Sequence, residues 1–146
     1  MCLWNAWLMS NSRIREAVIG DQDQVISIWK SCDLVKPQND PVTDFHLALD
    51  TKDSTVLILE SEQEMLGAVV VGFDGHRGWC YYLGISTEHQ NSGNGRALVE
   101  AAENWLISRG APKAMLMVRN SNAHVIGFYE KLGYSVEDTS VLGMRF

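Results

Sequence analysis

The chain has 146 residues, of which 46% are hydrophobic and 21% charged, and this balance suits one globular domain with a substantial core. Its formal net charge of −6 argues against the basic surface through which proteins bind nucleic acid. No stretch reaches the roughly 18 consecutive apolar residues of a membrane-spanning helix, so no membrane partner is expected.

Hydrophobic periodicity and turn residues predict a mixed α/β domain. In chain order the predicted elements are a strand at 13–19, a helix at 22–31, a loop at 33–43, a short helix at 44–49, strands at 55–59, 65–73 and 79–85, a helix at 93–109, a strand at 114–118, a helix at 123–132 and strands at 134–136 and 141–144. Residues 13–146 are expected to form a single domain behind an N-terminal extension at 1–12. The apolar first nine residues suit packing on the domain, contact with another subunit, or an upstream start site that leaves Met9 as the initiator.

Cysteine spacing and the distribution of charge add two expectations. Cys2, Cys32 and Cys80 are widely spaced and odd in number, which indicates reduced thiols in a cytoplasmic protein and no metal site. Residues 1–73 carry 11 acidic and 5 basic side chains, whereas residues 74–146 carry 7 of each. The acidic half could face a cationic substrate, or it could simply be a solvated surface.

A glycine-rich loop joins a predicted strand to the longest predicted helix and suits a phosphate group. It consists of Gln90, Asn91, Ser92, Gly93, Asn94 and Gly95, followed by Arg96. Glycine lets a ligand approach the backbone closely, and the N-terminus of the helix offers free N–H groups and a favourable dipole. The loop is not a Walker motif, because Arg96-Ala97 follows its second glycine, and it is not a dinucleotide fingerprint, because position 98 is leucine.

Two separate motifs resemble the GNAT family of N-acetyltransferases. The loop, preceded by YYLGI at 81–85, resembles the family's acetyl-CoA loop, and SNAHVIGFYEKLGY at 121–134 resembles its SNAxAIxLYExLGF segment. The order of predicted elements is also that of the family, and the stretches at 39–41, 74–78 and 81–84 look most like its YpeA-type branch. The resemblance implies the GNAT fold, with a mostly antiparallel sheet of six to seven strands between helices.

The resemblance also implies acetyl-CoA as acetyl donor, an amine as acceptor, direct attack and no metal. In the family, the strand at Leu83, Gly84 and Ile85 splays from the strand at 115–117 and leaves a gap for pantetheine. The Ile85 N–H is then expected to bind the thioester oxygen. The N–H groups of the loop, with those of Gly93, Gly95 and Arg96 foremost, are expected to bind pyrophosphate.

Tyr129 and Asn122 match family residues on the later helix. Tyr129 corresponds to the tyrosine proposed to protonate the coenzyme A thiolate, although its position also suits a core tyrosine. Asn122 corresponds to a residue that contacts the cofactor arm, and a simple helix cap is equally compatible with its position.

The residues that would bind and deprotonate the acceptor amine are harder to identify. The strand at 114–118 lacks the glutamate that serves as base in some family members. Asp74, His76 and Tyr81 are the candidate substrate residues, and no general base is assigned. A histidine in a turn is also compatible with a simple exposed polar residue.

Three functions remain open from the sequence. The leading hypothesis is an N-acetyltransferase acting on a small molecule or peptide, with homodimerisation possible. The alternatives are a non-catalytic acyl-CoA-binding sensor and an interaction domain in which Trp4, Trp7 and Leu8 cover a partner.

Overall fold

The computed structural model describes residues 11–146, which fall into two compact units, one ending at Leu116 and the other comprising Met117–Phe146. The apolar start of the chain, including Trp4, Trp7 and Leu8, lies outside the described residues. The elements are β1 (Ser12–Glu16), η1 (Ile19–Asp21), α2 (Gln22–Ser31), α3 (Pro41–Asp50), β2 (Ser54–Ser61), β3 (Met65–Phe73), β4 (Gly78–Ile85), η2 (Thr87–His89), α4 (Asn94–Ser108), β5 (Ala114–Leu116) and α5 (Ala123–Lys131). Among these residues, no helix is both long and apolar enough to cross a membrane.

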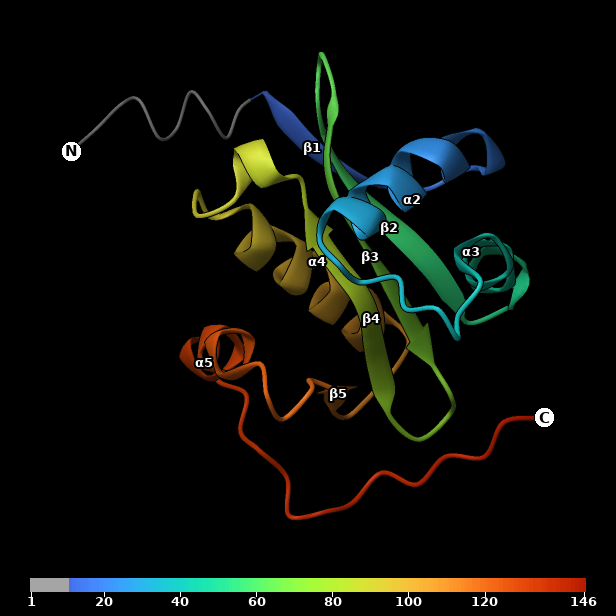
Figure 1. Ribbon diagram of the computed structural model, residues 1–146, viewed down its shortest axis with the longest axis vertical. Helices are drawn as coiled ribbons and strands as arrows, with labels where there is room; N and C mark the ends of the chain where they lie inside the picture. The colour runs from blue at the N-terminus through green and yellow to red at the C-terminus, as the bar shows by residue number, and fades with distance from the viewer. Residues whose placement is uncertain (1–10) are drawn as a thin grey trace. The chain divides into compact units, whose positions relative to one another are not determined.

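The first unit is built on a five-stranded sheet in the order β1-β2-β3-β4-β5. The first four strands are antiparallel neighbours, and β5 pairs parallel to β4. In Figure 1, α4 lies on one side of this sheet and α2 and α3 lie on the other. The predicted hairpins at 55–85 and the mixed α+β class are confirmed.

Each face of the sheet has its own apolar core because strand side chains alternate between faces. Leu57 and Leu59 of β2 belong to the core that α4 covers, whereas Val56 and Ile58 belong to the core under α2 and α3. Both faces are therefore covered, which explains why the central strands are almost continuously apolar in sequence.

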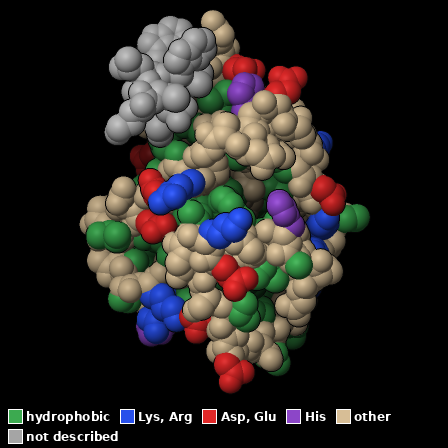
Figure 2. All heavy atoms as spheres, turned by 90° about the vertical axis from the view of Figure 1, so that its left-hand side faces the viewer, with side chains coloured by type: hydrophobic (Ala, Val, Ile, Leu, Met, Phe, Trp, Pro, Cys, Tyr) green, Lys and Arg blue, Asp and Glu red, His purple; other side chains and the backbone are tan. Residues whose placement is uncertain are grey.

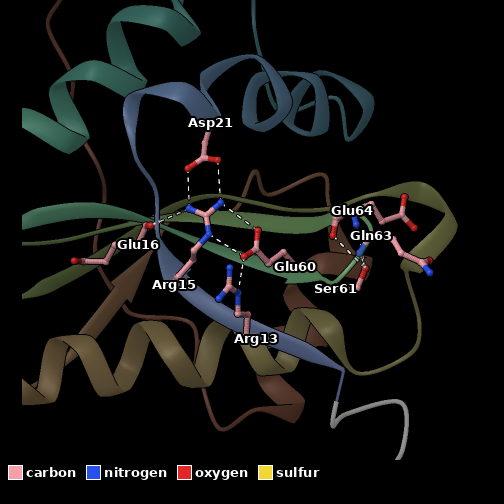
Figure 3. A network of polar contacts seen from close by, with 8 residues as sticks. All are labelled: Arg13, Arg15, Glu16, Asp21, Glu60, Ser61, Gln63 and Glu64. Atoms are coloured by element: carbon pink, nitrogen blue, oxygen red, sulfur yellow. Dashed lines mark hydrogen bonds and ion pairs between the residues drawn. The ribbon is translucent and has the colours of Figure 1, made fainter.

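A polar network joins β1 to β2 and to η1 (Figure 3). The Arg15 guanidinium donates to both carboxylate oxygens of Asp21, at 2.8 and 3.0 Å, and to Glu60 at 2.9 and 3.1 Å. Arg13 adds a 2.7 Å hydrogen bond to the same Glu60 carboxylate. Elsewhere, acidic and basic side chains are interspersed on the face in Figure 2. The network therefore stabilises β1, the edge strand that lies farthest from β4 in the strand order.

The helix that follows the predicted loop begins earlier than its sequence indicates. Two prolines favour a loop at 33–43, yet α3 starts at Pro41. Asp40 is its N-cap, since the carboxylate accepts from the Val42 N–H at 3.1 Å. Proline is well suited to a first helical position, because that N–H has no partner inside the helix. Pro41 therefore initiates a helix here.

The second unit contains α5 and an extended tail. Asn122 caps α5 by accepting from the Val125 N–H at 3.4 Å, and Gly133 adopts φ 98° just after the helix, as predicted. The predicted strands at 134–136 and 141–144 are wrong, because these residues carry no regular secondary structure. A short apolar run forms a strand only where its backbone can pair with a neighbouring strand. The described sheet accordingly has five strands rather than six or seven.

Candidate acetyl-CoA site

Among residues 11–146, no strand pairs with the second half of β4 on the side opposite β3, so this edge is open. The pairing of β4 with β5 covers only Gly78, Trp79 and Cys80, and β4 then continues to Ile85. β5 ends at Leu116, the last residue of the first unit, so the predicted separation of the two strands beyond that point stays a prediction. A strand edge of this kind presents backbone donors and acceptors to an extended ligand.

A β-bulge at Tyr82 begins the open segment. The β3–β4 register shifts between Ala68 and Val70, and Tyr82 has the left-handed φ of 55° that non-glycine residues rarely adopt. The Tyr82 ring stacks on Trp29 at a centroid distance of 4.4 Å, and its hydroxyl donates to Asp44 at 2.6 Å. Burial raises the pKa of Tyr82, with a further contribution from the bond to Asp44. Helices α2 and α3 therefore hold the strained residue in place.

The orientation of Ile85 follows from the ladder. The Ser86 N–H donates to the Leu66 carbonyl at 2.8 Å, and Ile85 is the Cα partner of Gly67. Because neighbouring residues of an antiparallel strand point their backbone groups in opposite directions, the N–H and carbonyl of Ile85 point away from β3. They face the open edge of β4. The Ile85 side chain packs in the core under α4.

The loop after β4 presents the N-terminus of α4. Gly93 adopts φ 86° and Asn91 φ 62°. The first helical hydrogen bond runs from the Ala97 N–H to the Gly93 carbonyl at 3.0 Å, which leaves the N–H groups of Asn94, Gly95 and Arg96 outside the helical ladder. The first turn carries no acidic side chain. Three aligned N–H groups at the positive end of a 15-residue helix suit an anion.

Side chains of the loop are used to hold its shape. Ser92 Oγ donates to the His89 carbonyl at 3.0 Å, and Asn94 Nδ2 donates to the same carbonyl at 2.9 Å. The Arg96 guanidinium is paired with Glu100 at 3.0 Å, on the exposed surface of α4. The donors that remain for a ligand at the start of the helix are therefore mainly backbone N–H groups.

The predicted substrate residues lie around the β3–β4 turn. Asp74 Oδ1 accepts from the N–H groups of His76 and Arg77 at 2.8 and 2.7 Å, and its Oδ2 accepts from Trp79 Nε1 at 3.1 Å. The two backbone bonds lower the pKa of Asp74, with Trp79 adding to the effect. The Trp79 and Tyr81 rings stack at 6.3 Å, and Tyr81 remains 42% exposed. Burial is the main cause of a raised pKa for Tyr81.

His89 lies in a second polar cluster beside the loop. Its Nε2 is 3.0 Å from Glu64, and its Nδ1 is 2.7 Å from Ser86 Oγ. The ligand atoms of Glu64, Glu88 and His89 lie within 4.8 Å of one another, although exposed acidic groups commonly adopt such positions without an ion. The absence of a metal from the reaction stays a prediction.

Tyr129 and Asn122 belong to the second unit. The Tyr129 ring packs edge-on against Phe128 at 5.0 Å and Tyr134 at 5.6 Å. Asn122 acts as the cap of α5. Their roles toward a cofactor remain predictions.

The sequence relatives decide the family. The profile described as "Acetyltransferase (GNAT) family" matches residues 23–134. The chain belongs to the GNAT family. An acetyltransferase of Yersinia pseudotuberculosis is 43% identical over 125 residues, which cover 86% of this chain and 89% of that protein. As the sequence predicts, this GNAT protein is an acetyltransferase that uses acetyl-CoA; its place in the YpeA-type branch stays a prediction.

Solved structures show the same fold. A transcriptional regulator from Bacillus halodurans C-125 matches with a TM-score of 0.77 and 22% identity, over 92% of this chain and 99% of that chain. AAC(6')-Iy, in complex with the bisubstrate analogue CoA-S-monomethyl-acetylneamine, matches with a TM-score of 0.77 and 14% identity, over 92% and 97% of the two chains.

Several residues around the GNAT donor strand have no signal in the sequence. Cys32 donates to the Ile85 carbonyl across 53 positions, and Tyr82 bonds to Asp44 across 38. Such contacts depend on tertiary packing, which local periodicity does not encode. The contact between Trp79 and Tyr81, in contrast, could be predicted from the sequence. The two residues are two positions apart on one strand, so their side chains lie on the same face of the sheet.

Proposed function

We propose that this GNAT protein transfers the acetyl group of acetyl-CoA to the primary amine of a small molecule by direct attack. The observation that carries the proposal is the open edge of β4, together with the free N–H groups at the start of α4, the next long helix in the chain. An extended pantetheine arm and an anionic pyrophosphate are the two chemical parts of coenzyme A that such a pair of features suits.

The donor half of the reaction follows from the backbone. Pantetheine pairs with the β4 edge, and the Ile85 N–H donates to the thioester oxygen as negative charge develops there. A fixed donor at that point stabilises the tetrahedral intermediate more than the ground state. The N–H groups of Gly93, Asn94, Gly95 and Arg96 bind the pyrophosphate, with Gln90, Asn91 and Ser92 shaping the loop.

Departure of the coenzyme requires a proton. Tyr129 supplies it to the thiolate, and Asn122 contacts the cofactor arm. A phenol with an ordinary pKa near 10 is a slightly weaker acid than a thiol of pKa near 8.5, so a positioned hydrogen bond must favour the transfer.

The acceptor amine lies near the aromatic pair Trp79 and Tyr81. An aromatic face attracts an ammonium group, and the Asp74 carboxylate adds negative charge at the same turn. A tyrosine is neutral at pH 7 and burial raises the pKa of Tyr81 further, so its hydroxyl orients the amine rather than deprotonating it. Because Asp74 already accepts from three donors, the ammonium group releases its proton through water to the bulk solvent, and the neutral amine then attacks the thioester. His76 lies within the same turn.

The acceptor class is a cationic small molecule. The acidic excess of residues 1–73 supports it, as does the fold shared with AAC(6')-Iy, whose structure holds an acetylneamine analogue. A panel of aminoglycosides, polyamines, amino sugars and short peptides, incubated with acetyl-CoA, tests the proposal by mass spectrometry of the products. Saturable acetylation of at least one small amine is expected. Acetyl-CoA binding without transfer to any amine would instead support the sensor.

A further inference from the structure

The backbone carbonyl of Ile85 is held by two side chains from different parts of the chain. The Cys32 thiol donates to it at 3.1 Å, and the Gln90 side-chain amide donates at 3.0 Å. Cys32 is the C-cap residue that follows α2, and Gln90 is the C-cap residue that follows η2 in the loop before α4. The Ile85 carbonyl at the end of β4 therefore connects α2 with the glycine-rich loop.

This carbonyl needs donors because of where it lies. It points to the open edge of β4, where a continuous sheet would supply an N–H from the neighbouring strand. Ile85 is only 9% exposed, so an unpaired carbonyl there would lose hydrogen bonding that water could not fully restore. Cys32 and Gln90 take the place of the absent ladder partner.

Gly84 allows α2 to approach closely enough for the contact. A Cβ at Gly84 would lie 3.2 Å from Leu34 Cδ1, 3.3 Å from Ile28 Cγ2 and 3.4 Å from the Cys32 sulfur. These atoms already cover the glycine on that side. The end of α2 is therefore packed directly on the strand segment that carries Ile85, and movement of the helix end would be transmitted to that segment.

We propose that Cys32 and Gln90 are positioning residues for acetyl transfer, which by sharing the Ile85 carbonyl fix the end of β4 and aim the Ile85 N–H at the thioester. The inference rests on the proposed function, since it assigns the task that the two side chains perform in that reaction. Neither residue exchanges a proton or forms a bond with substrate. Because the N–H and carbonyl of one strand residue point to the same side, the Cys32 thiol also lies at the coenzyme site.

Substitutions at Cys32 test the inference through kinetics. Cys32→Ala removes the donor, and we expect kcat to fall about tenfold while KM for acetyl-CoA changes less than about twofold. Cys32→Ser restores a donor and should recover most of kcat. Gln90→Met removes the second donor at similar volume and should lower kcat in the same way. Thermal melts of each variant establish that it folds.

Alkylation provides a second readout that needs no turnover. N-ethylmaleimide should modify Cys32 several-fold more slowly when dethio-coenzyme A is bound. Cys80 is the internal control, because burial raises its pKa to about 12 and its low reactivity should not respond to the ligand. Peptide mapping separates the signals of Cys32 and Cys80 from each other and from that of Cys2.

The outcomes separate the two claims. If the wild type transfers acetyl groups while Cys32→Ala and Gln90→Met retain its kcat, the positioning role is wrong and the proposed function stands. If Cys32→Ser fails to recover the kcat that Cys32→Ala loses, Cys32 only packs against its neighbours and the positioning role is again wrong. If the wild-type protein shows no saturable binding of acetyl-CoA, the proposed function itself fails.

Discussion

Gly67 of β3 is the residue whose enlargement should most directly disturb the donor end of β4. A Cβ added to Gly67 would lie 2.5 Å from Ile85 Cδ1, 2.8 Å from the Gly84 carbonyl oxygen and 3.0 Å from Leu98 Cδ1. The Ile85 methyl could rotate away, but the Gly84 oxygen belongs to the backbone. Gly67→Ala therefore has to move β4 at the segment that holds the Ile85 N–H.

The expected size of the effect comes from overpacking, which costs about 1–3 kcal/mol in a well-packed interior. For a protein of this length, that corresponds to a fall in Tm of about 2–12 °C. The proper control is Gly72→Ala on the same strand, where the nearest atom to the new Cβ is Ser54 Cβ at 3.2 Å and the nearest backbone oxygen is 3.6 Å away.

Thermal unfolding and steady-state kinetics measure both effects. Because the forced shift lies at the donor strand, Gly67→Ala should also lower kcat at least about tenfold, since small misplacements of reacting groups are costly. Gly72→Ala should keep kcat close to that of the wild type. Equal Tm and equal kcat for the two variants would show that a Cβ at position 67 does not displace the donor end of β4.

Three further predictions address the leaving group, the helix N-terminus and the polar network. Tyr129→Phe should keep acetyl-CoA binding and lower kcat about 10²-fold or more, and an unchanged kcat would remove the acid role. Gly93→Ala forces a side chain onto φ 86°, at a cost of about 1–2 kcal/mol, and should raise the Kd for acetyl-CoA in titration calorimetry; an unchanged Kd would contradict the anion site. Hydrogen bonds from Arg15 hold the pKa values of Asp21 and Glu60 below their ordinary range. These ion pairs therefore stabilise the fold fully at any pH above the ordinary carboxyl pKa values. Their contribution to the free energy of unfolding is lost as the pH falls through the lowered pKa values. Arg15→Met should therefore destabilise the protein by about 1–2 kcal/mol at pH 7, with melts converging on the wild type below about pH 4, whereas a constant difference would exclude this linkage.

Local signals in the sequence were sufficient for several elements in each of the two units. The helix predicted at 22–31 is confirmed as α2, and the predicted turn at 74–78 lies between β3 and β4. Asn122 and Gly133 delimit α5 as predicted. In each case the deciding residue acts on its immediate neighbours through a cap, a turn or a left-handed φ, and such effects are readable in a short window.

What the sequence did not reveal depends on distant contacts. The bulge at Tyr82 requires Trp29 beneath the ring and Asp44 at the hydroxyl, and neither residue is near in sequence. The same is true of Cys32, whose widely spaced position predicts only a reduced thiol. The predicted strands at 134–136 and 141–144 are wrong for a related reason. An apolar pattern alone does not show whether a neighbouring strand is present to pair with the segment.

In the proposed reaction, the open edge of β4 and the N-terminus of α4 together bind acetyl-CoA for transfer to an amine. Titration of the full-length protein with acetyl-CoA, repeated on Gly93→Ala, tests it most directly. We expect saturable one-to-one binding by the wild type and clearly weaker binding by the variant, which alters one residue of the glycine-rich loop. Absence of saturable binding by the wild type, or equal affinity of the two proteins, would contradict it.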